Sequence, residues 1–212
     1  MRTPGYALCA PCQSHRDLSG GVLADLVVPV SYSPRTGQHH HNLRSYKASP
    51  PSLRAKWNVL ALLLLFLRDH LDCINTRAGG RRTHLVTVPS TRGIPGPHPL
   101  ALLIGDRLGL PRLGARVNAT HEAGNRQFRP EWFEVEPLPT ERPVHALVLD
   151  DTWTTGAHAQ SLAHRLKASG AASVAVVALG RHVRPEHEPS RQLLNAIKEP
   201  IFDLSTCAAE GR

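Results

Sequence analysis

Two neighbouring acids, Asp150 and Asp151, stand between an apolar run and a threonine-rich segment. Adjacent carboxylates repel each other, and neither acid is an obvious packing residue, so their pairing suggests that something binds there. The segment that follows supplies hydroxyl groups and then Gly156, which permits a positive φ angle or a close backbone approach. Its backbone N–H groups and the N-terminus of a following helix can cradle a phosphate. The carboxylates suit a neighbouring group that is rich in hydroxyls or carries a metal, and a phosphorylated sugar meets both demands.

The elements on either side must hold this segment in place. Residues 144–149 form a short apolar stretch typical of a buried strand, and residues 173–179 form a second one. Between them, residues 157–169 carry apolar side chains at helical spacing and end before Gly170, the expected C-terminal stop. This strand–helix–strand order predicts an α/β fold with a parallel sheet covered by helices. Ligands of such sheets bind beyond the carboxyl ends of the strands, which is where residues 150–157 fall.

The stretch LVLDDTWTTGA resembles the phosphoribosyl pyrophosphate (PRPP) motif of type I phosphoribosyltransferases, an apolar strand followed by two acids and a threonine-rich loop closed by Thr-Gly. The resemblance implies a Rossmann-like parallel sheet flanked by helices, with a small variable N-terminal or hood region. It also implies that Asp150 and Asp151 hold the ribose 2- and 3-hydroxyls and act on a Mg²⁺ ion only indirectly, through these hydroxyls or water. The residues implied to wrap the 5-phosphate are Thr152, Trp153, Thr154, Thr155, Gly156, Ala157 and His158.

Two residues depart from the motif. Trp153 is bulkier than the usual aliphatic residue and is expected to pack under the loop, and His158 stands where threonine or serine is common. A simpler interpretation of the segment is that Asp151 or Thr155 caps the following helix. Capping explains one residue of the series and leaves the others unexplained, so we favour the phosphate site.

A second loop follows a strand predicted at residues 84–90. In the family, a loop after an earlier core strand binds pyrophosphate, and the resemblance implies this role for VPSTRG, residues 88–93. The arginine would neutralise pyrophosphate charge while backbone amides donate to its oxygens. An ordinary turn with an exposed arginine is the alternative. The residues assigned to this loop are Ser90, Thr91, Arg92 and Gly93.

The N-terminal part of the chain resembles the ComF group, competence-associated proteins of the same superfamily. CAPC at residues 9–12 precedes LRSYK at residues 43–47 and a leucine-rich helix predicted over residues 53–71. We therefore divide the chain into a variable segment with C-x-x-C, residues 1–52, and a phosphoribosyltransferase-like α/β domain, residues 53–212.

The Cys9–Cys12 pair admits three interpretations. It is half of a zinc site, completed through the fold by His15, Cys73 or the histidines at 39–41; a redox pair; or a lone cysteine pair. A second C-x-x-C is absent from the sequence, which favours the lone pair.

Less specific patterns complete the secondary-structure prediction. Residues 25–33 indicate a strand with a proline break, and residues 35–42 indicate a polar loop that exposes three histidines. The helix over residues 53–71 is expected to be well buried along a stripe that includes Trp57. A short helix closed by a glycine is expected over residues 100–110.

The part of the chain from residue 112 to residue 143 mixes strand and loop signals. Its Arg116 and Arg126 either lie on a mobile flap that closes over the site or are solvated charges. A further strand-like piece occurs at residues 199–205.

The composition describes a basic chain of 212 residues with a formal net charge of +8 and a pI of about 9.9. Such a protein attracts anions, including phosphorylated metabolites and nucleic acid. The longest apolar run, residues 59–67, is shorter than the roughly 20 residues that a membrane span needs, and the N-terminus does not resemble a secretory signal. We therefore expect a cytoplasmic protein with no membrane segment.

Together these features predict a Mg²⁺-dependent phosphoribosyltransferase that transfers the phosphoribosyl group of PRPP to an unknown acceptor and releases pyrophosphate. Asp150, Asp151 and Arg92 are expected to carry catalysis, mainly by positioning and charge stabilisation. Two other functions stay open: a PRPP or nucleotide sensor without catalysis, and a ComF-like accessory of DNA uptake that binds single-stranded DNA. The family also suggests a homodimer. Neither a P-loop nor a G-x-G-x-x-G follows a predicted strand.

Overall fold

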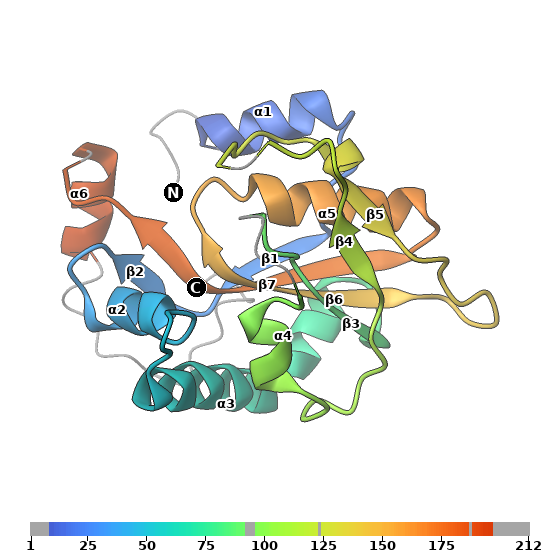
Figure 1. The fold of residues 1–212 in the computed structure, drawn as a ribbon. Helices are drawn as coiled ribbons and strands as arrows, with labels where there is room; N and C mark the ends of the chain where they lie inside the picture. Colours follow the sequence, from blue (N-terminus) through green and yellow to red (C-terminus); the bar gives the residue numbers. More distant parts are fainter. Residues whose placement is uncertain (1–8, 92–95, 123, 187, 197–212) are drawn as a thin grey trace.

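The computed structural model describes residues 9–91, 96–122, 124–186 and 188–196 (Figure 1). Its helices are α1 (Ala10–Leu18), α2 (Gln38–Ser45), α3 (Leu53–Arg77), α4 (Pro99–Ile104), α5 (Ala157–Ala168) and α6 (Glu188–Ala196), with a 3-10 turn, η1, at Pro130–Trp132. Its strands are β1 (Leu26–Pro29), β2 (Tyr32–Pro34), β3 (His84–Thr87), β4 (Ala115–Val117), β5 (Phe133–Val135), β6 (His145–Trp153) and β7 (Ser173–Val183).

A parallel sheet forms the centre of the molecule. β7 lies between β6 and a broken edge strand made of β1 and β2, and β3 pairs with the other side of β6. Because all of these pairings are parallel, two strands that follow each other in the chain and lie side by side need a crossover connection. Helix α5 supplies the crossover between β6 and β7. The predicted α/β architecture is therefore confirmed, as is the strand with a proline break near residue 30.

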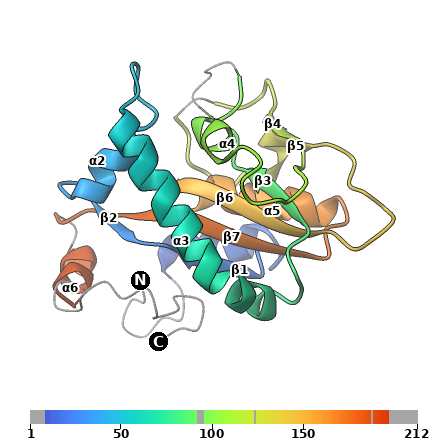
Figure 2. The same cartoon turned by 90° about the horizontal axis from the view of Figure 1, so that it is seen from below.

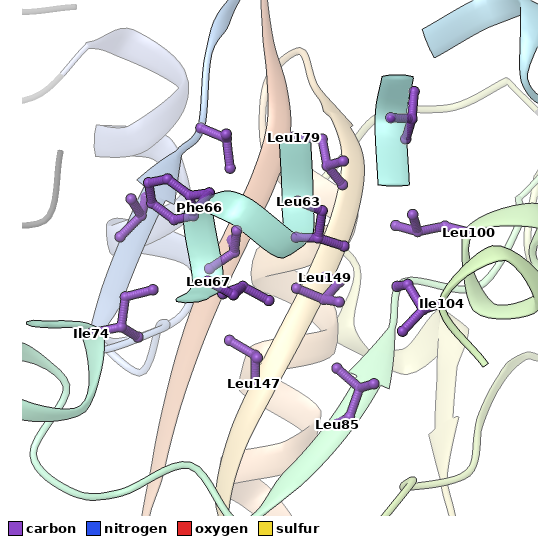
Figure 3. Packing of buried hydrophobic residues seen from close by; sticks show 14 of the residues in the cluster. Leu63, Phe66, Leu67, Ile74, Leu85, Leu100, Ile104, Leu147, Leu149 and Leu179 are labelled. Atoms are coloured by element: carbon purple, nitrogen blue, oxygen red, sulfur yellow. The ribbon is translucent and has the colours of Figure 1, made fainter. Parts of the chain in front are cut away.

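Helices cover both faces of this sheet. α2, α3 and α4 lie on one face, and α5, α1 and the antiparallel β4–β5 hairpin lie on the other (Figures 1 and 2). Successive side chains of a strand point to opposite faces. Thus Leu147 and Leu149 pack against α3 and α4 (Figure 3), whereas Ala146 and Val148 pack against α5. These two hydrophobic clusters hold β6 rigidly up to the point where its acids begin.

The long helix α3 extends further than the leucine pattern predicts and presents a different face. It begins after Ser52, whose hydroxyl caps it, and continues to Arg77. Leu63 and Leu67 are buried, but Trp57 is 68% exposed, so its predicted place in the buried stripe is wrong. The run of leucines makes this helix apolar on nearly every side, and periodicity alone does not identify the side that meets the sheet. Neither α3 nor any other helix in the described part of the chain is long and apolar enough to cross a membrane.

The polar loop predicted at residues 35–42 is wrong over most of its length, because α2 occupies it. Tertiary contacts hold this helix: Leu43 packs so closely against Gly180 of β7 that a β-carbon there would lie 2.3 Å from its Cδ1. In addition, the His39 ring donates from Nε2 to the carbonyl of Leu179 at 2.9 Å. The histidine run is therefore partly built into the fold instead of being an exposed loop.

Both strands of the strand–helix–strand unit are longer than predicted. β6 continues to Trp153, so the two acids lie inside the strand and not after it, and β7 continues to Val183. The strands extend because they go on pairing with each other, up to Trp153↔Arg181. The helix between them ends as predicted, followed by Gly170 with a φ of +101°.

The remaining elements differ from prediction mainly in length. β3 ends at Thr87, and α4 ends at Ile104 before Gly105, whose φ is +52°. The residues before position 53 contribute α1, β1, β2 and α2, and so share the sheet and its cores with the rest of the chain. The strand-like piece at residues 199–205 lies outside the described residues.

Candidate functional site

The acid pair lies at the carboxyl end of β6, beside the end of β7. Because both acids belong to the strand, the pleat directs Asp150 and Asp151 to opposite faces of the sheet. Asp151 is buried, at 5% exposure, whereas Asp150 is half-buried. The two carboxylates therefore have different surroundings and different chemistry.

Asp151 lies at the centre of a set of contacts that we call the Asp151 clamp, formed with Tyr46, Lys47 and His98. Its Oδ2 accepts hydrogen bonds from the Tyr46 hydroxyl (2.6 Å) and the Lys47 ammonium (2.5 Å), and His98 Nε2 lies 3.5 Å away. His98 Nδ1 accepts a hydrogen bond from the Leu100 N–H (3.1 Å), which leaves the Nε2 proton facing the carboxylate. Burial raises the pKa of Asp151, but the charge of Lys47, the nearby His98 ring and the two hydrogen bonds outweigh burial and hold that pKa below its ordinary value. Asp151 is thus an ionised group whose Oδ2 is held by the protein.

Asp150 has the opposite character. Burial and then the charge of Asp151 raise the pKa of Asp150 to about 7, while a hydrogen bond from the Thr152 N–H to Oδ1 (3.3 Å) and the charge of Lys47 oppose them only in part. A carboxyl group with this pKa gains free energy by taking up a proton or by binding a cation or hydroxyl donors. Asp150 is therefore the member of the pair that a ligand can use.

A tight loop, Thr154–Gly156, joins β6 to α5. Gly156 has a φ of +81°, and a β-carbon at this position would lie 2.0 Å from Cζ2 of Trp153. Trp153 is 7% exposed and packs directly beneath the loop, consistent with its expected role. The loop conformation therefore depends on glycine for two reasons, its backbone angle and the indole ring below it.

Helix α5 begins without a side-chain cap on its N-cap residue, Gly156. The capping interpretation is wrong for Asp151, because that carboxylate is held in the clamp on the other face. Thr155 Oγ1 accepts a hydrogen bond from the Ala157 N–H at 3.3 Å, which satisfies one of the N–H groups of the first turn. The remaining N–H groups and the positive end of the helix dipole favour an anion at this position.

His158, in the first turn of α5, is tied to the segment after β4. Its Nε2 donates to the carbonyl of Asn125 at 2.9 Å, and its ring lies 5.8 Å from that of His121. Burial lowers the pKa of His158, and the charges of His121 and Arg126 act in the same direction. The side chain is therefore neutral and already hydrogen-bonded, so only the backbone of His158 faces the loop.

The second predicted loop lines a cavity of about 690 Å³. Ser90 and Thr91 contribute to its wall, with residues from the start of α4 and from the hairpin. None of the residues from Asp150 to His158 lines it, but His98 does, and His98 also belongs to the Asp151 clamp. The cavity and the acid pair are thus neighbouring regions joined through one imidazole. Arg92 and Gly93 lie outside the described residues.

The three partners of Asp151 were not predicted as site residues. Tyr46 and Lys47 entered the sequence analysis only as part of the LRSYK resemblance, and His98 did not enter it. Tyr46 lies 105 positions before Asp151, and no local pattern links positions so far apart. The available signal was a lysine beside a tyrosine just before a long apolar helix, which is unusual for a loop without a ligand or a partner acid.

Arg116 and Arg126 are both exposed. Arg116 forms an ion pair with Glu134 across the β4–β5 hairpin, at 2.6 Å from Nη2 to Oε2. Arg126 lies next to Asn125 and acts on His158. Arg116 thus belongs to the antiparallel β4–β5 pair and Arg126 to the loop that follows β4, and the flap interpretation stays a prediction.

The cysteine pair is reduced, with its two Sγ atoms 3.3 Å apart at the start of α1. Burial and the neighbouring Cys9 raise the pKa of Cys12 to about 11. Within the residues that the structure describes, no group of three or more His, Cys, Asp or Glu side chains is arranged to hold a metal.

Comparisons with known proteins add one structural similarity. No family model matches the chain, and no curated protein matches it. Among solved structures, the chain is similar to adenine phosphoribosyltransferase from Saccharomyces cerevisiae, complexed with D-2,5-dideoxy-2,5-imino-altritol 1,6-bisphosphate and adenine. The identity is 15%, the match covers 72% of this chain and 80% of that chain, and the TM-score is 0.38. A similarity of this size does not assign a function, so the site itself must carry the proposal.

Proposed function

We propose that this protein is a Mg²⁺-dependent phosphoribosyltransferase, which binds PRPP, transfers its phosphoribosyl group to an acceptor and releases pyrophosphate. The observation that carries the proposal is the position of Asp150, an acid of raised pKa beside the N-terminus of a helix that lacks a side-chain cap. The loop and helix favour a phosphate, and the acid favours hydroxyl donors or a cation. A phosphorylated ribose offers both kinds of group on one small molecule.

In this proposal the 5-phosphate binds in the loop between β6 and α5. Threonine hydroxyls at its mouth and the backbone N–H groups of the first turn of α5 donate to the phosphate oxygens. Gly156 permits the approach because it has no side chain and holds a left-handed φ. The donors that we assign to the phosphate are the hydroxyls of Thr152, Thr154 and Thr155 and the amides of Gly156 and His158.

The two acids have separate roles toward the ribose. Asp150 accepts hydrogen bonds from the ribose hydroxyls and fixes the orientation of the ring. The clamp contacts of Asp151 share its Oδ2, so Oδ1 is the oxygen that we assign to a ribose hydroxyl. Lys47, with 16% of its side chain exposed, is fixed by Asp151 and adds positive charge beside the anionic ligand.

The site fits Mg²⁺, which prefers oxygen ligands and keeps several waters. Asp150 offers a half-buried carboxyl group whose pKa would fall when a cation binds beside it. The ion would be held by oxygens of PRPP and, through ribose hydroxyls or water, by Asp150 and Asp151. When bound, it supplies positive charge against the pyrophosphate group.

The transfer breaks the bond between ribose C1 and the pyrophosphate oxygen and forms a bond from C1 to the acceptor, which loses a proton. Positioning supplies most of the rate enhancement. Pyrophosphate leaves toward the cavity, where Ser90 and Thr91 donate to its oxygens. We assign no described side chain as general base for the acceptor.

The test is calorimetric titration of PRPP, with and without Mg²⁺, into the wild type, Asp150→Asn and Asp106→Asn, an exposed acid after α4 that serves as the matched control. We expect Mg²⁺-dependent binding to the wild type and the control, and binding at least tenfold weaker in Asp150→Asn. Equal affinity in all three proteins, or no binding by folded wild type, would refute the proposal.

Two further measurements separate the alternative functions, namely the fate of PRPP in the presence of acceptors and the binding of oligonucleotides. A sensor would bind PRPP and leave it intact in the presence of purine, pyrimidine and ammonia acceptors. A DNA-uptake accessory would bind single-stranded oligonucleotides with a steep salt dependence and would not require PRPP.

A further inference from the structure

β2 and β7 end beside α2 (Figures 1 and 2). Basic side chains that the proposed PRPP site does not use act on two histidines there. Strand pairing places Ser33 opposite His182, and the Ser33 hydroxyl lies 3.5 Å from Nδ1 of His40. The rings of His40 and His182 are 5.1 Å apart. We call the group around these two rings the cationic cluster, which consists of Arg35, His40, Arg44, Arg126, His182 and Arg184.

The strongest charges that act on the two histidines are all positive. Burial lowers the pKa of His182, and the charges of Arg184, Arg126 and Arg35 lower it further. Arg35 also acts on His40. The four arginines are exposed and the two histidines are half-buried. Pro34 pairs with Val183 at the end of β2 and β7, so Arg35 and Arg184 each follow a paired residue. Neighbouring like charges are unfavourable by themselves, and an anion bound among them would reduce the repulsion.

The cationic cluster adjoins the loop that we assign to the 5-phosphate. Trp153 pairs with Arg181 across the strands, and His182 is the next residue of β7. Arg126, a member of the cluster, lowers the pKa of both His158, in the first turn of α5, and His182. A molecule bound against the end of β7, with PRPP in the loop, would meet these charges.

We infer that the acceptor of the proposed reaction carries an acidic group, either a carboxylate or a phosphate, and that the cationic cluster binds it. This inference rests on the proposed function and assigns the substrate class of its second ligand. Guanidinium groups suit the task because their donors match the two oxygens of a carboxylate or phosphate.

The test compares ligand pairs that share a ring and differ by one acidic group. The pairs are nicotinate and nicotinamide, orotate and uracil, and benzoate and benzamide, each titrated calorimetrically with and without saturating PRPP and Mg²⁺. The proteins are the wild type, the Arg35→Gln, Arg184→Gln double variant, and the control Arg54→Gln, Arg77→Gln, whose exposed arginines lie on α3.

We expect the acid to bind at least tenfold more tightly than its neutral partner in one pair or more, because a charge-assisted hydrogen bond is worth about that factor. The preference should fall about tenfold in the double variant and persist in the control, while PRPP affinity stays the same in both. The inference is overturned if neutral members bind equally well, if no member of any pair binds, or if the double variant keeps the preference.

Two further titrations distinguish acid binding by the cluster from a failure of the PRPP site and from nucleic-acid binding. PRPP titrated alone reports on the proposed function, so its failure is visible independently of the acid preference measured without PRPP. An oligothymidylate that binds the wild type with a steep salt dependence, and loses binding in the double variant, would assign the cluster to nucleic acid and overturn the inference.

Discussion

At the carboxyl end of β6, the adjacent residues Asp150 and Asp151 have opposite surroundings on the two sides of the sheet. On one side Asp151 is buried and satisfied by Tyr46, Lys47 and His98, which are distant in sequence. On the other side Asp150 faces a short loop and a helix N-terminus without a side-chain cap, and its pKa is raised to about 7. On the first side, Oδ2 of Asp151 is satisfied within the protein. On the second side, Asp150 gains free energy from a ligand.

In addition to burial, the ionised Asp151 on one side of β6 raises the pKa of Asp150 on the other side. The charge of Asp151 contributes to the raised pKa of Asp150, and it persists at neutral pH because the clamp holds Asp151 ionised. The pleat of the strand fixes the two carboxylates on opposite faces, so neither can move to reduce their repulsion. Four variants test this difference between the two sides of β6.

The largest effect is expected from Lys47→Met, which leaves a buried carboxylate without its cation. Removing one partner of a buried ion pair costs about 3–5 kcal/mol of unfolding free energy. The measurement is urea denaturation at pH 7, with Lys167→Met as the control, because Lys167 pairs with Asp25 at a more exposed position. The control should cost about 1 kcal/mol or less. Equal losses in the two variants would show that the clamp is no stronger than a surface pair.

A somewhat smaller loss is expected from Gly156→Ala. Its φ is +81° and its β-carbon would collide with the ring of Trp153, so the loop must move at a cost of about 2–4 kcal/mol. PRPP binding should be lost with it, measured by calorimetry. Gly124→Ala is the matched control, because Gly124 has a φ of +82° and no atom within 4 Å of the added carbon. Backbone strain alone should make the control cost about 1 kcal/mol; if both variants cost the same, the ring beneath the loop is irrelevant.

Asp150→Asn should change how stability depends on pH. The pKa of Asp150 rises from 3.8 to about 7 on folding, so between these values the folded protein holds a proton that the unfolded chain has released. The acid therefore makes the wild type less stable as pH rises through this window, by up to about 1.4 kcal/mol per pH unit. The variant lacks this loss and should be more stable than the wild type at pH 8, although it binds PRPP more weakly.

Urea denaturation at pH 5 and pH 8 tests this expectation, with Asp106→Asn again as the control. The difference between variant and wild type should grow from pH 5 to pH 8 for Asp150→Asn only. A variant that is less stable than the wild type at pH 8 would show that the ionised Asp150 is satisfied within the protein, and the difference between the two sides of β6 would no longer hold.

The smallest effect on stability is expected from Arg116→Gln, on the β4–β5 hairpin at the wall of the cavity. Its exposed pair with Glu134 should contribute about 0.5 kcal/mol or less to stability. PRPP affinity should change less than twofold if the arginine is a solvated charge. A tenfold loss of PRPP affinity at unchanged stability would instead assign Arg116 to a flap that closes over the ligand.

Sequence reasoning succeeded where chemistry and periodicity agree over a short stretch. The apolar strands, the helix from Ala157 and the glycine stop after it follow from local patterns, and the parallel sheet follows from their order. It failed where a face had to be chosen among many apolar residues, as at Trp57 on α3, or where tertiary contacts impose helix on a polar segment, as in α2. The acids were identified, but their separation by the pleat depends on β6 continuing to pair with β7 beyond residue 149.

The sequence by itself determined the parts of this protein that depend on neighbours along the chain. These are the α/β order, the acid pair, the glycine of the loop and the start of α5, because strand pairing, helix periodicity and turn geometry act over a few residues. Only the tertiary structure decided what surrounds each acid. The clamp brings Tyr46, Lys47 and His98 to Asp151, and α2 and β7 bring like charges together around His182. Electrostatic interactions depend on distance in space and on burial, and both are known only once the sheet and its helices are in place.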